Sequence, residues 1–234
     1  MTRLVLAAAA VVVLAVPGFA ACARNSDGTA VRAESSVSAA TTATSSAPSR
    51  TVATDTPESS EPGVVDTSRR AVPSNAQVCV QDLTGQTATA TVTDPAAPKV
   101  TVSVPDGWSV APGSGDVGAR FTGPDDMLAE ISITATALDP AAAFTRYSDD
   151  VMAKYPISTL SLLPADLCGY SGQKLMGTWA DDPEESTEYQ DRVTHIWTNS
   201  KNYLVAIHVE APSGTAGFDA AASTLTSDLD IVIP

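Results

Sequence analysis

One stretch of the 234-residue sequence decides the fold, residues 188–210, which read EYQDRVTHIWTNSKNYLVAIHVE. Apolar and polar side chains alternate on both sides of residues 199–202, which have the composition of a turn. The stretch therefore predicts a β-hairpin with apolar residues on both faces. One face would hold Tyr203, Val205, Ile207 and Val209, and the other Val193, Trp197, Leu204 and Ala206. One face needs a core, and the other needs a helix, a partner or a ligand.

The register of this hairpin decides where its two histidines lie. With the turn centred between residues 200 and 201, His195 lies opposite Ala206. His208 then lies opposite Val193, so both histidines share one face as diagonal neighbours, about 7–8 Å apart at Cα. Such a pair has room for a bridging metal, but the sequence offers no third ligand. The alternative is two sheet histidines with hydrogen bonds inside the protein, and no metal site is expected.

Shorter runs on either side of the hairpin complete the fold. They predict strands at residues 78–80, 88–93, 100–104, 119–122, 128–137, 157–162 and 170–179. Asp139-Pro140 has the form of a helix start, with Asp as N-cap and Pro at the first helical position. An apolar stripe then follows at helical spacing, formed by Phe144, Tyr147, Val151 and Tyr155. A last helix is expected at residues 213–229, before a closing edge strand at 230–233. The fold class is α+β, a central antiparallel β-sheet with two or more packed helices.

The N-terminus has the pattern of an export signal. A short positive start precedes an apolar run at residues 4–16, which is well below the roughly 20 residues of a membrane-spanning helix. Residues 19–22 read FAAC and resemble a bacterial lipobox, in which the cysteine receives a diacylglycerol. We therefore expect a signal peptide at 1–22 with Cys22 as the lipidated residue. Ordinary cleavage after Ala23 is the alternative, since residues 21–23 also have the small-x-small form.

A stalk is expected to separate this anchor from the folded domain. Between residues 35 and 62, twenty-two of twenty-eight residues are Ser, Thr, Ala or Pro, so large apolar side chains are too few to offset the entropy of ordering. We expect a disordered stalk at 23–75 and a globular domain at 76–234. The expected location is the outer face of the cytoplasmic membrane, in the cell envelope, with partial secretion as a further outcome.

The three cysteines fit this organisation. If Cys22 carries lipid, Cys79 and Cys168 remain as an even pair in an exported domain, where disulfides are favoured. The sequence therefore predicts a Cys79–Cys168 disulfide. Two unrelated buried thiols are the alternative. A zinc site is not expected, because neither cysteine has a second ligand at the required spacing.

Charge limits the partners of the domain. Residues 76–234 carry seven Lys and Arg against twenty-one Asp and Glu, a net charge of −14 that equals the formal charge of the whole chain. A domain of this sign repels phosphate backbones, so nucleic acid is excluded as a partner. It also repels anionic lipid headgroups, which favours a domain that stands off the membrane on its stalk.

Residues 104–108 read VPDGW and open the domain behind a signal peptide, a lipobox and a Ser/Thr/Pro-rich stalk. In this layout the chain resembles the LpqN/LpqT-type lipoproteins of actinobacteria, a family that includes a proline-rich secreted antigen. The resemblance implies a PsbP-like sandwich, no established enzymatic activity, and a role in cell-envelope biogenesis or host interaction. The family pattern has a helix before this turn. Residues 78–93 are instead rich in β-forming side chains, so the chain is a divergent member.

The function expected is binding or scaffolding, with no cofactor and no catalytic residues. The partner would be an envelope lipid or an envelope protein, beside the membrane itself through the lipid anchor. The open face of the sheet gives the candidate ligand-binding residues, which are Trp197, His195, Leu204 and His208. A serine hydrolase of envelope esters is the alternative. It would use Ser171, which lies in a near match to the G-x-S-x-G nucleophile motif, with a histidine as base.

Overall fold

The computed structural model describes residues 61–67, 69–182 and 184–234. The expected signal peptide, Cys22 and most of the expected stalk lie outside these residues. The described part is mostly antiparallel β-sheet with two helices, so the α+β class is confirmed, with the sheet as the larger component. No helix within it is both long enough and apolar enough to cross a bilayer.

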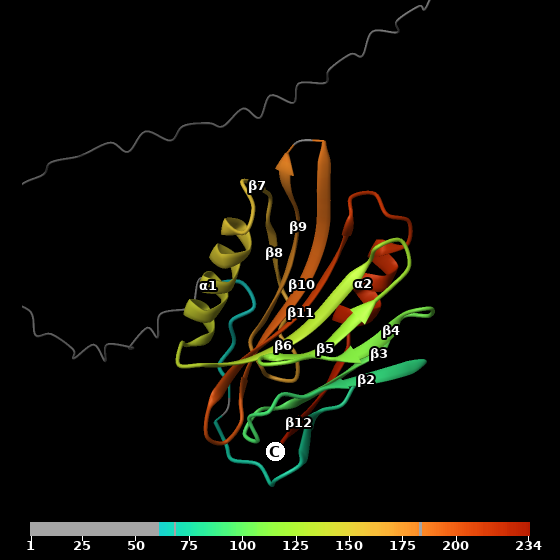
Figure 1. Ribbon diagram of the computed structural model, residues 1–234. Helices are drawn as coiled ribbons and strands as arrows, with labels where there is room; N and C mark the ends of the chain where they lie inside the picture. The colour runs from blue at the N-terminus through green and yellow to red at the C-terminus, as the bar shows by residue number, and fades with distance from the viewer. Residues whose placement is uncertain (1–60, 68, 183) are drawn as a thin grey trace, which may run out of the picture. The chain divides into compact units, whose positions relative to one another are not determined.

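The larger sheet has eight strands and is antiparallel throughout (Figure 1). Its spatial order is β4 (Ser109–Pro112), β5 (Val117–Thr122), β6 (Leu128–Thr136), β11 (Asn202–Pro212), β10 (Glu185–Trp197), β9 (Gly172–Asp182) and β7 (Ile157–Ser158). β8 (Ser161–Pro164) also pairs with β9. The predicted hairpin is β10–β11, which forms the centre of this sheet.

A second, four-stranded sheet was not expected. Its order is β1 (Ala76–Cys79), β12 (Leu229–Ile233), β3 (Lys99–Val104) and β2 (Gln86–Ala90). The prediction of one central sheet is therefore incomplete, and β12 is an internal strand, not the closing edge strand that was predicted. Alternation along a strand identifies the face on which a residue lies, but not the sheet to which the strand belongs.

The main core lies between the two sheets. The larger sheet contributes the buried residues Phe121, Ile131, Ile133, Tyr203, Val205, Ile207 and Val209. The smaller sheet contributes Val100, Val102, Val104, Leu229, Ile231 and Ile233. Helix α2 (Phe218–Thr226) closes the core with Phe218, Ala221, Ala222 and Leu225. The apolar face predicted for residues 203–209 is confirmed.

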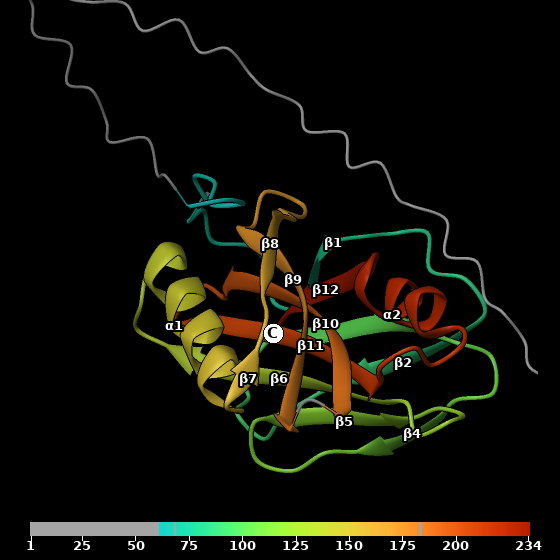
Figure 2. The same ribbon diagram turned by 90° about the horizontal axis from the view of Figure 1, so that it is seen from above.

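Helix α1 (Pro140–Ala153) covers the opposite face of the larger sheet, so α1 and α2 lie on opposite sides of it (Figure 2). Helix α1 begins as predicted, because the side chain of Asp139 accepts a hydrogen bond from the Ala142 N–H at 2.9 Å. Its buried contact with the sheet is formed by Phe144, Leu175, Trp179, Tyr189, Val193 and Ala206. α2 is shorter than predicted, because Gly214 and Gly217 take positive φ angles of 84° and 83° before it begins.

The register of the β10–β11 hairpin differs from the prediction. His195 lies opposite Leu204, and His208 lies opposite Asp191. The turn is centred one residue earlier than expected, since the Thr198 N–H donates to the Lys201 carbonyl and Asn199 takes a left-handed φ of 67°. This shift moves every pairing by two residues, so the histidines still share a face but are not diagonal neighbours.

The structured domain begins before residue 76, where composition placed its start. The N-terminal strap consists of residues 62–67 and 69–72. It hydrogen-bonds to the larger sheet through the Gly172 N–H, which donates to the Gly63 carbonyl at 2.9 Å. At its far end, the side-chain amide of Asn199 pairs with both backbone groups of Val72. Val64 packs against the core under α1, and Val72 packs against the core between the sheets. The strap is therefore part of the fold.

The predicted disulfide is present. Cys79 and Cys168 are joined, with Cα atoms 5.6 Å apart and a sequence separation of 89 residues. Cys79 ends β1, and Cys168 lies in the loop before β9, so the bond joins the smaller sheet to a loop of the larger one.

Candidate functional site

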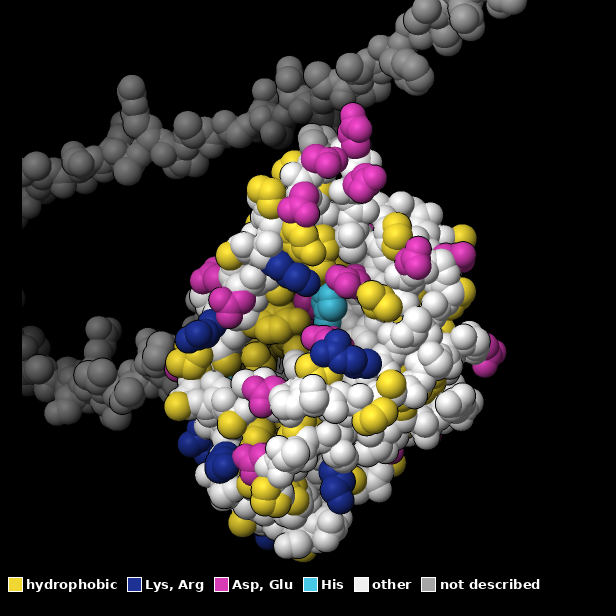
Figure 3. Space-filling model, in the orientation of Figure 1, with side chains coloured by type: hydrophobic (Ala, Val, Ile, Leu, Met, Phe, Trp, Pro, Cys, Tyr) yellow, Lys and Arg dark blue, Asp and Glu magenta, His cyan; other side chains and the backbone are white. Residues whose placement is uncertain are grey.

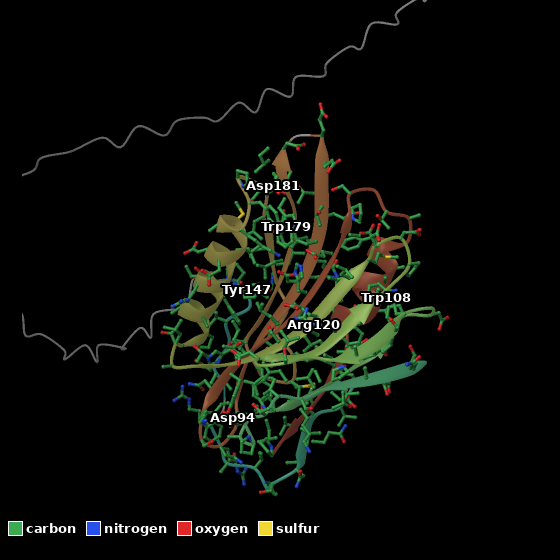
Figure 4. The ribbon with its side chains drawn as sticks, in the orientation of Figure 1. Asp94, Trp108, Arg120, Tyr147, Trp179 and Asp181 are labelled. Atoms are coloured by element: carbon green, nitrogen blue, oxygen red, sulfur yellow. A yellow bond between two sulfur atoms is a disulfide. The ribbon has the colours of Figure 1, made fainter. Side chains whose placement is uncertain are left out.

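Four charged side chains lie side by side on the outer face of the larger sheet, the face that α1 covers in part. The strand register places Arg120 beside Glu130, Glu130 beside His208, and His208 beside Asp191. The charges therefore alternate in sign across β5, β6, β11 and β10. Figure 4 shows the position of Arg120 at one end of this row.

Asp191 is the centre of a hydrogen-bond network. Its carboxylate is fully buried, accepts from Nδ1 of His208 at 2.5 Å, and accepts from the Tyr147 hydroxyl at 3.0 Å. The other ring nitrogen of His208, Nε2, lies 3.2 Å from Glu210 Oε2. Because Tyr147 belongs to α1, the network also attaches this helix to the sheet (Figure 4).

The network fixes the charge of His208. Burial alone would lower the pKa of His208, but hydrogen bonds to Asp191 and Glu210 and the charges of these carboxylates raise it to about 9. The same hydrogen bond with His208 lowers the pKa of Glu210. Burial and the Asp191 charge hold the pKa of Tyr147 well above its usual value. At neutral pH His208 is therefore an imidazolium that donates from both nitrogens, which makes it unsuited to act as a general base.

Aromatic rings pack along one side of His208. Trp179 stacks on Tyr189 with ring centroids 4.5 Å apart and on His208 at 5.3 Å. Lys154 is the C-cap residue of α1, and its ammonium lies 4.1 Å from the centroid of the Trp179 ring. This cation–π contact holds the lysine head beside the network.

A cavity of about 500 Å³ lies between α1 and the outer face of β6 and β11, and we call it the α1 groove. Its polar lining is Ser132, Thr134, Thr136, Arg146, Tyr147 and Asp150. Its apolar lining is Ala135, Ala137, Leu138, Ala143, Leu204 and Ala206. Small side chains predominate, which leaves space between the helix and the sheet.

A smaller cavity of about 220 Å³, the His208 hollow, lies beside it. Its lining is Arg120, Phe121, Thr122, Leu128, Ala129, Glu130, Lys154, His208 and Glu210. The outward residues Glu130 and His208 are each two positions along their strands from Ser132 and Ala206 of the α1 groove, a step of about 7 Å. The two cavities are therefore neighbours on one face. Figure 3 shows a hollow with hydrophobic side chains inside it, beside a histidine flanked by Lys and Arg side chains.

Two leucines are exposed at the ends of this surface. Leu138 lines the α1 groove and is 37% exposed, whereas Leu128 lines the His208 hollow and is 45% exposed. Exposed leucines at the openings of neighbouring cavities favour an apolar occupant.

The four predicted ligand-binding residues do not form one site. Leu204 lines the α1 groove and His208 lines the neighbouring hollow. His195 is 2% exposed, and its Nε2 lies 3.0 Å from the Leu138 carbonyl, so it is a buried structural histidine whose pKa burial lowers. Trp197 lines a separate cavity of about 380 Å³ beside the strap, with Val72 among its neighbours. The prediction assumed that this face of the sheet is open, whereas α1 covers part of it.

The idea of a metal between the two histidines is not supported. Within the described residues, no group of three or more His, Cys, Asp and Glu side chains is arranged to hold a metal ion.

Ser171, the nucleophile of the hydrolase alternative, is fully buried. Its hydroxyl donates to the Val65 carbonyl and accepts from the Val65 N–H, both at 3.0 Å. These bonds attach the strap to the sheet. The serine is therefore not presented to a substrate.

Sequence reasoning missed the partners of His208. Asp191 and Glu210 were counted only as surface charge, and Tyr147 only as an apolar helix residue. A signal was present for Glu210, because residues 208 and 210 of one strand share a face. The contact with Asp191 needed the correct hairpin register, and the contact with Tyr147 needed the position of α1.

No protein-family model matches the chain, and no curated protein matches it either. Among solved structures the chain is similar to that of LpqN, which is described as involved in cell envelope biogenesis of Mycobacterium tuberculosis. The two chains are 19% identical, the match covers 63% of this chain and 91% of LpqN, and the TM-score is 0.49. Membership of the LpqN/LpqT-type family therefore stays a prediction.

Proposed function

We propose that the domain is a non-catalytic binding module of the cell envelope, and that the α1 groove holds the apolar chain of a lipid-like ligand. The observation that carries this proposal is the groove itself. Its volume of about 500 Å³ falls within the usual range of small-molecule sites, and its lining combines small apolar residues with a few polar groups.

The polar groups beside the groove support binding more than catalysis. Asp191 is fully buried and accepts two hydrogen bonds, and His208 donates to carboxylates on both sides. A general base needs a free lone pair near neutral pH, and His208 has none there. The buried Ser171 supports the same choice over a serine hydrolase.

A single lipid-like molecule fits the groove better than a protein partner does. The space is concave and has α1 as one wall, whereas protein interfaces are usually flatter and larger, about 800 Å² on each partner. We expect the ligand to be an envelope lipid, with an envelope protein as the alternative partner. Lipidation at Cys22 would keep the domain at the outer face of the cytoplasmic membrane, and partial release would carry it into the medium.

The test is native mass spectrometry of lipids that co-purify with residues 23–234, which include the whole described domain. A bound lipid is expected in the parent chain and should be lost in Thr134→Trp, because Thr134 is an exposed strand residue that lines the groove. Thr89→Trp is the control, since Thr89 is an exposed threonine on β2 of the other sheet.

Equal lipid content in the two tryptophan variants would contradict the proposal. So would a groove filled by a second copy of the chain, which would appear as a dimer that only Thr134→Trp dissociates.

A further inference from the structure

The basic residues of the domain are concentrated at this site. Residues 76–234 contain seven Lys and Arg in all. Three of the seven line the two neighbouring cavities: Arg146 at the α1 groove, and Arg120 and Lys154 at the His208 hollow. The same linings hold three carboxylates, Asp150, Glu130 and Glu210, so Lys and Arg balance Asp and Glu here, whereas the domain as a whole has a net charge of −14.

Burial separates the two signs of charge in the hollow. The side chain of Asp191 is fully buried and those of Glu210 and Glu130 are 26% and 37% exposed. Arg120 is 55% exposed, and Lys154 is exposed as well. A molecule that enters from solvent therefore meets the cations before the carboxylates.

The two exposed cations retain hydrogen-bond donors. Arg120 uses one nitrogen, Nη1, in its 3.0 Å ion pair with Glu130. Within the described residues, Lys154 has no carboxylate oxygen within 4.0 Å, and its ammonium contacts the Trp179 ring instead. Guanidinium and ammonium groups with free N–H bonds are the usual ligands of phosphate.

We propose that the His208 hollow binds the anionic, phosphate-type head of an amphiphile whose acyl chain lies in the α1 groove. This inference rests on the proposed function, and it names the ligand class. α1 connects the two ends, because Ala143 lines the groove and Lys154 lines the hollow, about 16 Å apart along the helix. Both N–H groups of His208 already bond to carboxylates, so His208 donates no hydrogen bond to the head group and contributes only its positive charge.

The ligand is a single extracted lipid rather than a membrane surface. The acyl chain is held in the α1 groove beside the hollow, a position that a lipid still packed in a flat bilayer cannot take. The net charge of the domain also repels an anionic bilayer at long range.

The test uses two probes that differ only in the phosphate, 1-myristoyl-glycerol-3-phosphate and 1-myristoyl-glycerol. Their affinities for residues 23–234 are measured by calorimetry below the aggregation limit of each lipid. The phosphate is expected to tighten binding about tenfold, as two partly exposed ion pairs would. The double variant Arg120→Gln/Lys154→Gln should lose this gain and keep its affinity for the neutral probe.

Lys99→Gln is the control, because Lys99 is an exposed cation on β3 of the smaller sheet. Equal affinity of the parent for both probes, or an equal loss in Lys99→Gln, would overturn the inference. The proposed function would survive that result if Thr134→Trp weakens both probes. Binding of neither probe would remove both proposals.

Anionic vesicles containing phosphatidic acid form the last arm, with flotation as the measurement. No binding is expected. Vesicle binding that Thr134→Trp leaves unchanged would assign the cations to a membrane surface and overturn the inference.

Discussion

His208 keeps its positive charge because a carboxylate contacts each of its ring nitrogens. The pKa of about 9 lies above the ordinary value of 6.5 that the unfolded chain has. Folding therefore favours the protonated ring, and the pH determines how much this preference stabilises the domain.

We predict that the domain loses stability as the pH rises from about 6.5 through 9. The stabilisation from His208 is fully present below the unfolded pKa and disappears as the pH passes the folded one, a loss of about 3 kcal/mol. Urea unfolding at a series of pH values measures it. His208→Gln should flatten the profile between pH 6.5 and 9, and an unchanged slope in that variant would assign the effect to another group.

The charge of the histidine could not be predicted from the sequence. Its two partners come from β10 and from two residues further along β11. Only the contact with Glu210 is local in the sequence. The contact with Asp191 depends on where the turn is centred. Asn199 shifts that centre, because its side chain is bound by the strap and its backbone takes a left-handed conformation.

At the scale of elements, α2 depends on an arginine from another strand. Arg192 on β10 donates through Nη1 to the carbonyls of Thr226 and Ser227 at 2.9 and 2.8 Å, and through Nη2 to the Ala165 carbonyl at 3.0 Å. The first two carbonyls belong to the C-terminal end of α2, where the helix leaves acceptors unsatisfied and favours a positive charge.

We predict that Arg192→Met destabilises the domain by about 2–3 kcal/mol, because it leaves three buried or partly buried carbonyls without a donor. Hydrogen exchange should increase in residues 218–227 more than in the rest of the domain. Arg192→Lys should be intermediate, since one ammonium cannot reach all three acceptors. Uniform exchange across the domain would show that Arg192 stabilises the sheet rather than the helix.

The elements themselves were mostly predictable. Residues 128–137 alternate strictly enough to define β6, and Asp139-Pro140 marks the start of α1, because both signals depend on local geometry. β4 was missed because all four of its residues are exposed, so it has no apolar pattern. The division into two sheets was missed because pairing partners are far apart in the sequence.

At the scale of the whole molecule, the strap crosses from one core to the other. It pairs with Gly172 and Ser171 near one end and with Asn199 near the other, and its valines pack in different cores. Composition could not reveal this role, because most of the contacts use the backbone of the strap, which every sequence has.

We predict that a chain beginning at residue 76 is less stable than one beginning at residue 61. The loss should be about 2–4 kcal/mol, from the uncovered apolar surface and from the hydrogen bonds that Ser171 and Asn199 lose. Urea unfolding of the two chains gives the difference. Equal midpoints would show that the strap lies on the domain without stabilising it.

The place of β12 in the smaller sheet has a consequence for how the domain forms. Residues 229–233 lie between β1 and β3, so strands that begin at residues 76 and 99 wait for a partner that leaves the ribosome much later. Such pairings are slow, because a long loop must close before any contact compensates for it. Until residue 233 has been synthesised, β1 and β3 each have an edge with unpaired backbone N–H and C=O groups, with which any other extended chain can pair. A chain whose synthesis stops before β12 therefore lacks an internal strand of the smaller sheet, although only its C-terminal residues are missing.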